Sequence, residues 1–216
     1  MIEAIRAGLA ARADPAKAPD MQRYMKSQLP FYGVQKAGRV QLAREVFEPL
    51  ERDEWERVVR TLWDEARFRE ERYMALAVLK DRRYRAHRDM AALPLYEKLI
   101  VTGAWWDLVD EVATGPLGAL LPDVAPVLRA WAVDEDLWKR RAAIIAQVTR
   151  KRETDFELLQ ACIEPNRGDR EFFIRKAIGW GLRSYAWIDP EAVVAYCETH
   201  ELAPLSRREA LKNVRT

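Results

Sequence analysis

Five residues with the chemistry of a catalytic or binding site share one helical phase of the sequence. Trp106, Arg141 and Lys176 are spaced by 35 residues, and equivalent positions of stacked repeats line up on neighbouring helices. Asp110 lies four residues after Trp106, which places it on the same helix face. Trp180 lies four residues after Lys176 and extends that face. A carboxylate there could stabilise a developing positive charge or orient water, and the indole rings would attract a cation.

The sequence around this phase repeats. The pattern of an aromatic residue, a basic residue three positions later and then small apolar residues is centred on Arg141 and on Lys176, and an echo of it surrounds Arg208. One step of 35 back from Trp106 reaches Glu71. This period is close to the ~34 residues of tetratricopeptide repeats and shorter than the ~40–47 of HEAT repeats. Because the tetratricopeptide Trp and Gly-Tyr pattern is absent, a short HEAT-like array is favoured.

Amphipathic helix patterns dominate the chain, and alternating strand patterns are missing. Residues 54–63 carry an apolar stripe at helical spacing, formed by Trp55, Val58, Val59, Leu62 and Trp63. Pro and Gly cut the chain into helices of roughly 8–18 residues. Cap residues agree with these cuts at Asp136, Asp169 and Asp189. The predicted fold is all-α, an α-α superhelix (solenoid) of HEAT-like two-helix repeats with a concave basic groove, in a single domain over residues 1–216.

The distribution of charge favours nucleic acid as the partner. The 36 Lys and Arg residues nearly balance the 34 Asp and Glu residues, so the net charge of +2 decides little. Acidic residues gather in residues 51–56, whereas further basic residues lie near the shared phase: Arg140, Arg150, Lys151, Arg152, Arg175, Arg183, Arg207, Arg208, Lys212 and Arg215. Cations suit phosphates, and flat rings suit bases or sugars.

Cys162 and Cys197 are expected to be reduced thiols, since neither belongs to a CxxC motif. His87 and His200 form no cluster with metal-ligand spacing, so neither a metal nor another cofactor is expected. The first residues do not resemble a signal peptide, and no apolar run approaches the ~20 residues of a membrane span. A cytoplasmic location without membrane attachment is expected.

Structural explanations exist for the same residues. Asp110 could be a solvated helix residue, and Arg141 and Lys176 could form ion pairs with neighbouring acids. Trp105 and Trp138 are expected in the core, where the Trp of a repeat helix usually lies. The adjacent indoles of Trp105 and Trp106 cannot both point the same way. Trp106 is therefore expected to look outward.

The chain resembles the bacterial HEAT-repeat alkylpurine DNA glycosylases, the DNA alkylation repair enzyme family. Five landmarks carry the resemblance in order along nearly the whole chain, and these are residues 23–26 (RYMK), 105–110 (WWDLVD), 137–144 (LWKRRAAI), 171–180 (EFFIRKAIGW) and 201–210 (ELAPLSRREA). The chain stops soon after the last landmark, so a later basic tail is missing, and weaker nonspecific affinity for DNA is expected.

The resemblance implies an enzyme of base excision repair that hydrolyses the N-glycosidic bond of positively charged N3- or N7-alkylated purines in duplex DNA. The catalytic cleft would comprise Trp106, Asp110 and Trp180. Arg141 would hold the backbone beside the lesion, and Tyr24 would contact DNA from the N-terminal helices. The further expected DNA contacts are Lys176, Arg207 and Arg208. A wide groove around the duplex favours a monomer.

The charge of the lesion explains why one carboxylate could suffice. An alkylated purine is already cationic and leaves without protonation, so the barrier lies in the positive charge that grows on the sugar. Asp110 would stabilise that charge. The alternative is a non-catalytic helical-repeat protein that binds nucleic acid through the same residues, and a protein-interaction scaffold is a weaker third reading.

Overall fold

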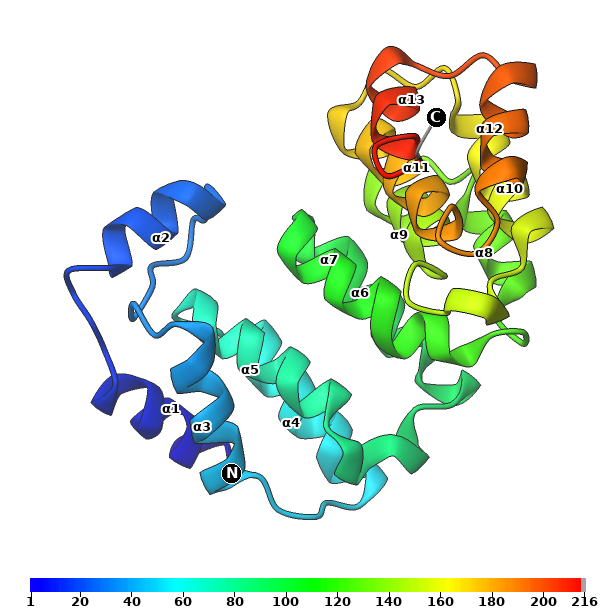
Figure 1. Cartoon of the computed structure of the whole chain (residues 1–216). Helices are drawn as coiled ribbons and strands as arrows, with labels where there is room; N and C mark the ends of the chain where they lie inside the picture. Colours follow the sequence, from blue (N-terminus) through cyan, green and yellow to red (C-terminus); the bar gives the residue numbers. More distant parts are fainter. Residues whose placement is uncertain (215–216) are drawn as a thin grey trace. The chain divides into compact units, whose positions relative to one another are not determined.

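The computed structural model describes residues 1–214, and this part of the chain is helical without any strand (Figure 1). The all-α prediction is thereby confirmed. The chain divides into two compact units, Met1–Arg88 and Asp89–Thr216. The prediction of a single domain over residues 1–216 stays a prediction. Arg215 of the predicted basic set lies outside the described residues.

Unit 1 is built from amphipathic helices around an aromatic core. Its α-helices are α1 (Ile2–Ala11), α2 (Ala18–Met25), α3 (Lys36–Val46), α4 (Arg52–Asp64) and α5 (Arg69–Lys80), followed by the 3-10 helix η1 (Arg82–His87). The predicted stripe of α4 is buried in full, and α4 packs along α5. Trp55 and Trp63 are among the largest fully buried side chains of unit 1.

Two buried acids at the start of α5 tie unit 1 together. The Glu70 carboxylate accepts hydrogen bonds from the backbone N–H groups of Tyr32, Gly33 and Val34 at 2.9–3.0 Å. Glu71 accepts from Nε of Arg6 at 2.9 Å and from the backbone N–H groups of residues 67 and 68. Glu71, which shares the phase of Trp106 in the sequence, therefore has a structural explanation.

Unit 2 contains α-helices and, between some of them, short 3-10 and π helices. Its α-helices are α6 (Leu93–Gly103), α7 (Trp106–Val112), α8 (Ala125–Trp131), α9 (Leu137–Ile145), α10 (Phe156–Ile163), α11 (Phe172–Tyr185), α12 (Pro190–Thr199) and α13 (Pro204–Ala210). Its short turns are η2 (Met90–Ala92), η3 (Ala113–Leu117), η4 (Gly118–Leu120), η5 (Lys151–Glu153) and η6 (Glu164–Asn166).

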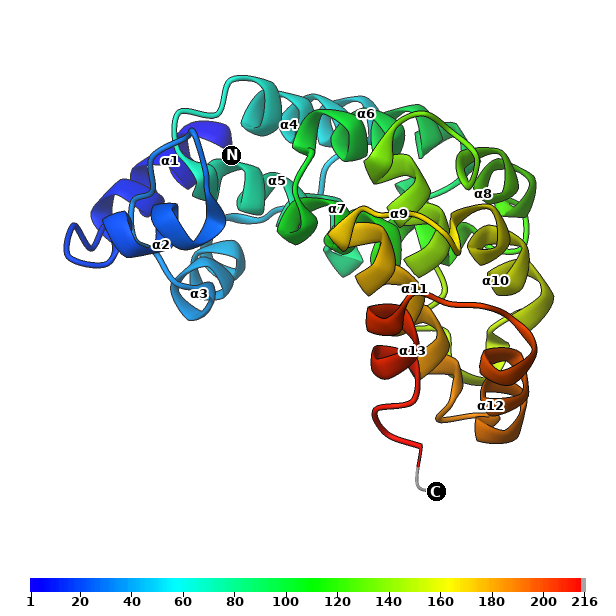
Figure 2. The ribbon, with the colours of Figure 1, turned by 90° about the horizontal axis from the view of Figure 1, so that it is seen from above.

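Every second helix of unit 2 packs against the next one of the same series. Helix α7 contacts α9, α9 contacts α11, and α11 contacts α13. Figure 2 shows α9, α11 and α13 in this order, from green to red, with α8, α10 and α12 beside them. Because Trp106, Arg141 and Lys176 lie on α7, α9 and α11, the 35-residue step predicts the neighbouring helices of unit 2 correctly.

Polar bonds between successive helix pairs carry the same spacing. Thr149 donates to the carbonyl oxygen of Thr114, 35 residues earlier, at 2.8 Å. The side-chain amide of Asn166 donates to the carbonyl oxygen of Ala132, 34 residues earlier, at 2.8 Å. These side chains satisfy carbonyl groups that the ends of short helices leave without helical partners. The repeat is therefore held by polar bonds between neighbours as well as by apolar packing.

The predicted caps hold at two of three positions. Asp136 accepts from the backbone N–H groups of Trp138 and Lys139 and caps α9, and Asp189 accepts from Ala192 and caps α12. Asp169 instead accepts from the N–H of Glu171 and stands two residues before the cap of α11.

In residues 1–214, no helix is both long enough and apolar enough to cross a bilayer.

Candidate active site

A two-pronged ion pair joins α7 to α9. Nε and Nη2 of Arg141 donate to Oδ1 and Oδ2 of Asp110, both at 2.7 Å. Nη1 of Arg141 donates to the carbonyl oxygen of Phe173 on α11 at 2.6 Å. One guanidinium on α9 therefore joins α7, through Asp110, and α11, through the carbonyl oxygen of Phe173. Planar, bidentate geometry makes this one of the stronger and more directional kinds of protein ion pair.

The two partners differ in their access to solvent. The side chain of Arg141 is 6% exposed, and that of Asp110 is 15% exposed. An ionised carboxylate can accept about four hydrogen bonds, of which Arg141 uses two. Asp110 thus keeps acceptor positions for a water molecule or a ligand, whereas three of the five N–H donors of Arg141 are bound within the protein.

Burial raises the pKa of Asp110 above its ordinary value. The hydrogen bonds and the positive charge of Arg141 oppose this effect, and the nearby negative charge of Asp107 adds to it. Arg141 therefore favours the ionised form of the carboxylate. Ion pairing of Arg141 with an acid, one of the explanations open from the sequence, is what the structure has.

Trp105 and Trp106, at the start of α7, are both half-buried, so the predicted division into a core Trp105 and an outward Trp106 is not seen in their burial. The aromatic contacts are those of Trp105. Its ring packs on Trp138 and Phe173, with ring centroids 6.3 and 5.3 Å away, and Trp138 is buried. Trp106 begins α7 one turn before Asp110 and is half-buried. Trp180 is also half-buried and lies on α11, seven residues after Phe173. The two indoles of the predicted cleft therefore stand on the helices that flank α9.

Lys176 and Arg183 share one counter-ion. Oε2 of Glu209 on α13 lies 3.0 Å from Nζ of Lys176 and 2.6 Å from Nη1 of Arg183. The sequence alone does not indicate Glu209 as a site residue, and it indicates Arg183 only as a nearby cation. The sequence does show an acid, Glu209, within a basic segment, and this could have suggested an ion pair. Its partners could not be predicted, because they depend on how α13 packs.

The other predicted DNA contacts are exposed. Arg207 and Arg208 lie on α13, and Nη1 of Arg207 donates to the carbonyl oxygen of Cys197. Tyr24 lies on α2 in unit 1, and 73% of its surface is exposed. That Tyr24 binds the same DNA as residues of unit 2 is a prediction from the sequence.

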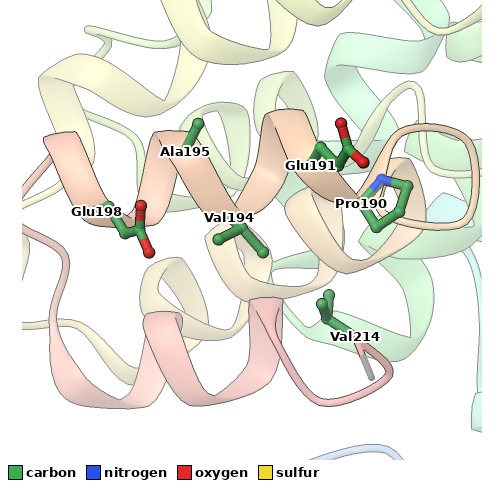
Figure 3. A pocket seen from close by; sticks show the side chains of 6 residues that line it. All are labelled: Pro190, Glu191, Val194, Ala195, Glu198 and Val214. Carbon is green, nitrogen blue, oxygen red and sulfur yellow. The ribbon is translucent and has the colours of Figure 1, made fainter. Parts of the chain in front are cut away.

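A separate hollow lies on α12. It has a volume of about 400 Å³ and is open to solvent. Figure 3 shows its lining on α12 and after α13, which is Pro190, Glu191, Val194, Ala195, Glu198 and Val214. None of the predicted site residues lines it, and its two carboxylates would repel a phosphate.

Comparison with known proteins identifies the family. The family model of the DNA alkylation repair enzyme matches residues 5–214. The structure is similar to that of a protein described as a predicted DNA alkylation repair enzyme from Enterococcus faecalis, with a TM-score of 0.87 and 26% sequence identity. The similarity covers 95% of this chain and 98% of that chain. No curated protein matches the chain. This chain belongs to the DNA alkylation repair enzyme family, and its role is in DNA repair.

Proposed function

We propose that this protein is a DNA glycosylase that excises positively charged N3- and N7-alkylated purines, such as 7-methylguanine and 3-methyladenine, from duplex DNA. The bond that breaks is the N-glycosidic bond, and water supplies the hydroxyl group at C1′ of the sugar. The single observation that carries the proposal is the Asp110 carboxylate, held by Arg141 at 2.7 Å yet still reached by solvent.

Asp110 acts on the sugar. As the bond to the cationic base lengthens, positive charge moves onto the deoxyribose ring, and a fixed carboxylate stabilises this charge without reorganisation. Its remaining acceptor positions orient the attacking water and take a proton from it. The departing base becomes a neutral purine, so no acid is required.

Trp106 and Trp180 offer aromatic faces to the cationic nucleotide. The attraction between such a face and a cation contributes about 0.5–2 kcal/mol, more as water is excluded. Both indoles are half-buried, which keeps part of each ring available. The proposed cleft is open, and the base need not enter a closed pocket.

Arg141 is a positioning residue in this proposal. Three of its donors are bound to Asp110 and to the carbonyl oxygen of Phe173. It therefore orients the carboxylate and favours its ionised form, and its 6% exposure leaves little surface for a contact with a phosphate. Lys176, Arg207, Arg208 and Tyr24 remain the proposed DNA contacts, with the protein acting as a monomer in the cytoplasm.

The test is the release of free base. The protein is incubated with duplex DNA that carries 7-methylguanine, and the free base is separated and quantified against a blank without protein. We expect release of 7-methylguanine and none of guanine from the unmodified duplex. The Asp123→Asn variant is a matched control, because Asp123 is an exposed acid of unit 2 away from α7.

The competing function is noncatalytic binding. Duplex binding at the same affinity for methylated and plain DNA, with no release of base, would replace the glycosylase by the nucleic-acid-binding alternative. Absence of both binding and release would contradict both functions.

A further inference from the structure

Two cations of α11 face solvent on either side of Trp180. Lys176 lies four residues before Trp180 and Arg183 three residues after it, so the three side chains share one face of the helix. The side chains of Lys176 and Arg183 are 36% and 22% exposed. A phosphate group that approached Trp180 would meet both cations.

Glu209 occupies the space between these cations from the side of α13. Its Oε2 pairs with Nζ of Lys176 at 3.0 Å and with Nη1 of Arg183 at 2.6 Å. The side chain of Glu209 is only 14% exposed, so the acid lies deeper than either cation. Hydrogen bonds from Lys176 and Arg183 hold the pKa of Glu209 below its ordinary value, and the carboxylate is charged at neutral pH.

Close packing of the two helices holds Glu209 in place. A Cβ atom at Gly179 would overlap the Cβ of Glu209 and lie 3.0 Å from the carbonyl oxygen of Ser206. Oγ of Ser206 donates to the carbonyl oxygen of Arg175 at 3.0 Å. The absence of a side chain at Gly179 thus lets α13 approach α11, which brings the backbone of Glu209 close to Lys176 and Arg183.

We propose that Glu209 is a built-in counter-ion that weakens the attraction of Lys176 and Arg183 for a DNA phosphate beside Trp180. With Glu209 ionised, the three side chains carry a net charge of one instead of two. Nonspecific affinity for DNA comes from neutralised phosphates, so Glu209 lowers the affinity for undamaged duplex in particular. Recognition then depends more on the cationic lesion. This inference rests on the proposed binding of duplex DNA.

The experiment measures binding of the full chain to an undamaged, fluorescently labelled duplex by anisotropy between about 50 and 200 mM salt. The Glu209→Gln variant keeps the size of the side chain and removes its charge. We expect it to bind about three- to tenfold more tightly at the low end of this range, and its salt slope to steepen by about one, as for one added phosphate contact.

The matched control is Glu198→Gln. Glu198 is an exposed acid on α12, and its replacement changes the net charge by the same amount. Equal tightening by Glu198→Gln would overturn the proposal, because the net charge would then be the cause. Unchanged or weaker binding by Glu209→Gln would also overturn it.

Two further variants separate charge from folding. Glu209→Asp keeps the charge and is expected to bind like the wild type, whereas tightening by this variant would contradict the proposal. The effect of Glu209→Gln is expected to shrink when Lys176 and Arg183 are both replaced by Gln, and an undiminished effect would contradict it.

Failure of the proposed chemistry is distinguishable from failure of this inference. If the protein binds duplex but releases no 7-methylguanine, the glycosylase proposal is wrong. The comparison of Glu209→Gln with Glu198→Gln still decides the role of Glu209 in that case. If neither the wild type nor Glu209→Gln binds duplex, both proposals are overturned.

Discussion

Helices α5 of unit 1 and α7 of unit 2 each carry a buried or nearly buried acid, but the two acids are satisfied differently. Glu71 on α5 is fully buried and is bound by two backbone N–H groups as well as by Arg6. Asp110 on α7 keeps some exposure and is bound by side-chain donors of Arg141. Both acids belong to the face that a 35-residue repeat predicts, so sequence position alone does not separate them.

The comparison shows what distinguishes a structural acid from a candidate catalytic one. Glu71 caps the start of α5, because it accepts from the backbone N–H groups of residues 67 and 68. Its neighbour Glu70 is likewise held by three backbone N–H groups. A carboxylate with open acceptor positions on a face reached by solvent can still meet a substrate. Burial and an ion pair are therefore common to both, and the unused acceptors make the difference.

The largest expected effect comes from exchanging the two acids for their amides. Asp110→Asn is expected to slow release of 7-methylguanine by about 10²–10³-fold, the usual loss on removal of one electrostatic stabiliser, while DNA binding stays largely intact. Glu71→Gln is expected to leave the rate within about twofold, because its bonds lie within unit 1. Single-turnover assays measure both rates, and near wild-type release by Asp110→Asn would remove Asp110 from the mechanism.

Glu71→Gln is also expected to destabilise unit 1. Glu71→Gln removes the buried acid that Nε of Arg6 binds at 2.9 Å and leaves Arg6 only its more exposed partners Glu3 and Glu65. We expect a loss of about 2 kcal/mol in the free energy of unfolding. Urea denaturation followed by circular dichroism measures this quantity. If Glu71→Gln were as stable as the wild type, Glu71 would not have the stabilising role proposed for it.

An intermediate effect is expected for Arg141→Ala. Without its guanidinium, Asp110 loses both side-chain donors, and release of base should fall about tenfold through a lower rate constant instead of weaker binding. The salt dependence of duplex binding decides between two roles for Arg141. An unchanged slope supports positioning, and a slope lower by about 0.9 supports the direct phosphate contact expected from the sequence.

The smallest expected effect is on the pH profile. The reaction requires ionised Asp110, so the rate should fall as the pH drops through the pKa of this group. Burial raises that pKa, and the midpoint of the acid limb is therefore expected above the ordinary Asp value of about 3.9. In Arg141→Ala the opposing charge is lost, and the limb should move to higher pH. Spontaneous depurination at each pH is subtracted with protein-free DNA, and an acid limb at the ordinary value would argue against Asp110.

Much of the helical architecture could be predicted from the sequence, because helix periodicity and helix breaks are local properties. The apolar stripe of residues 54–63 is buried as expected, and the caps at Asp136 and Asp189 are present. The 35-residue spacing also placed Trp106, Arg141 and Lys176 on α7, α9 and α11, alternate helices of unit 2 that contact one another in turn. Each of these features follows from residue type and spacing along the chain.

The partners of the charged side chains were decided by tertiary structure. Spacing assigns a side chain to a helix face, but the offset and distance between helices determine which opposite charge it meets. The approach of α13 at Gly179 brings Glu209 to Lys176, and the packing of α9 between α7 and α11 turns Arg141 toward Asp110 instead of solvent. The sequence by itself thus determined which residues share a face, and the packing of helices determined which of them keep a charge free for DNA.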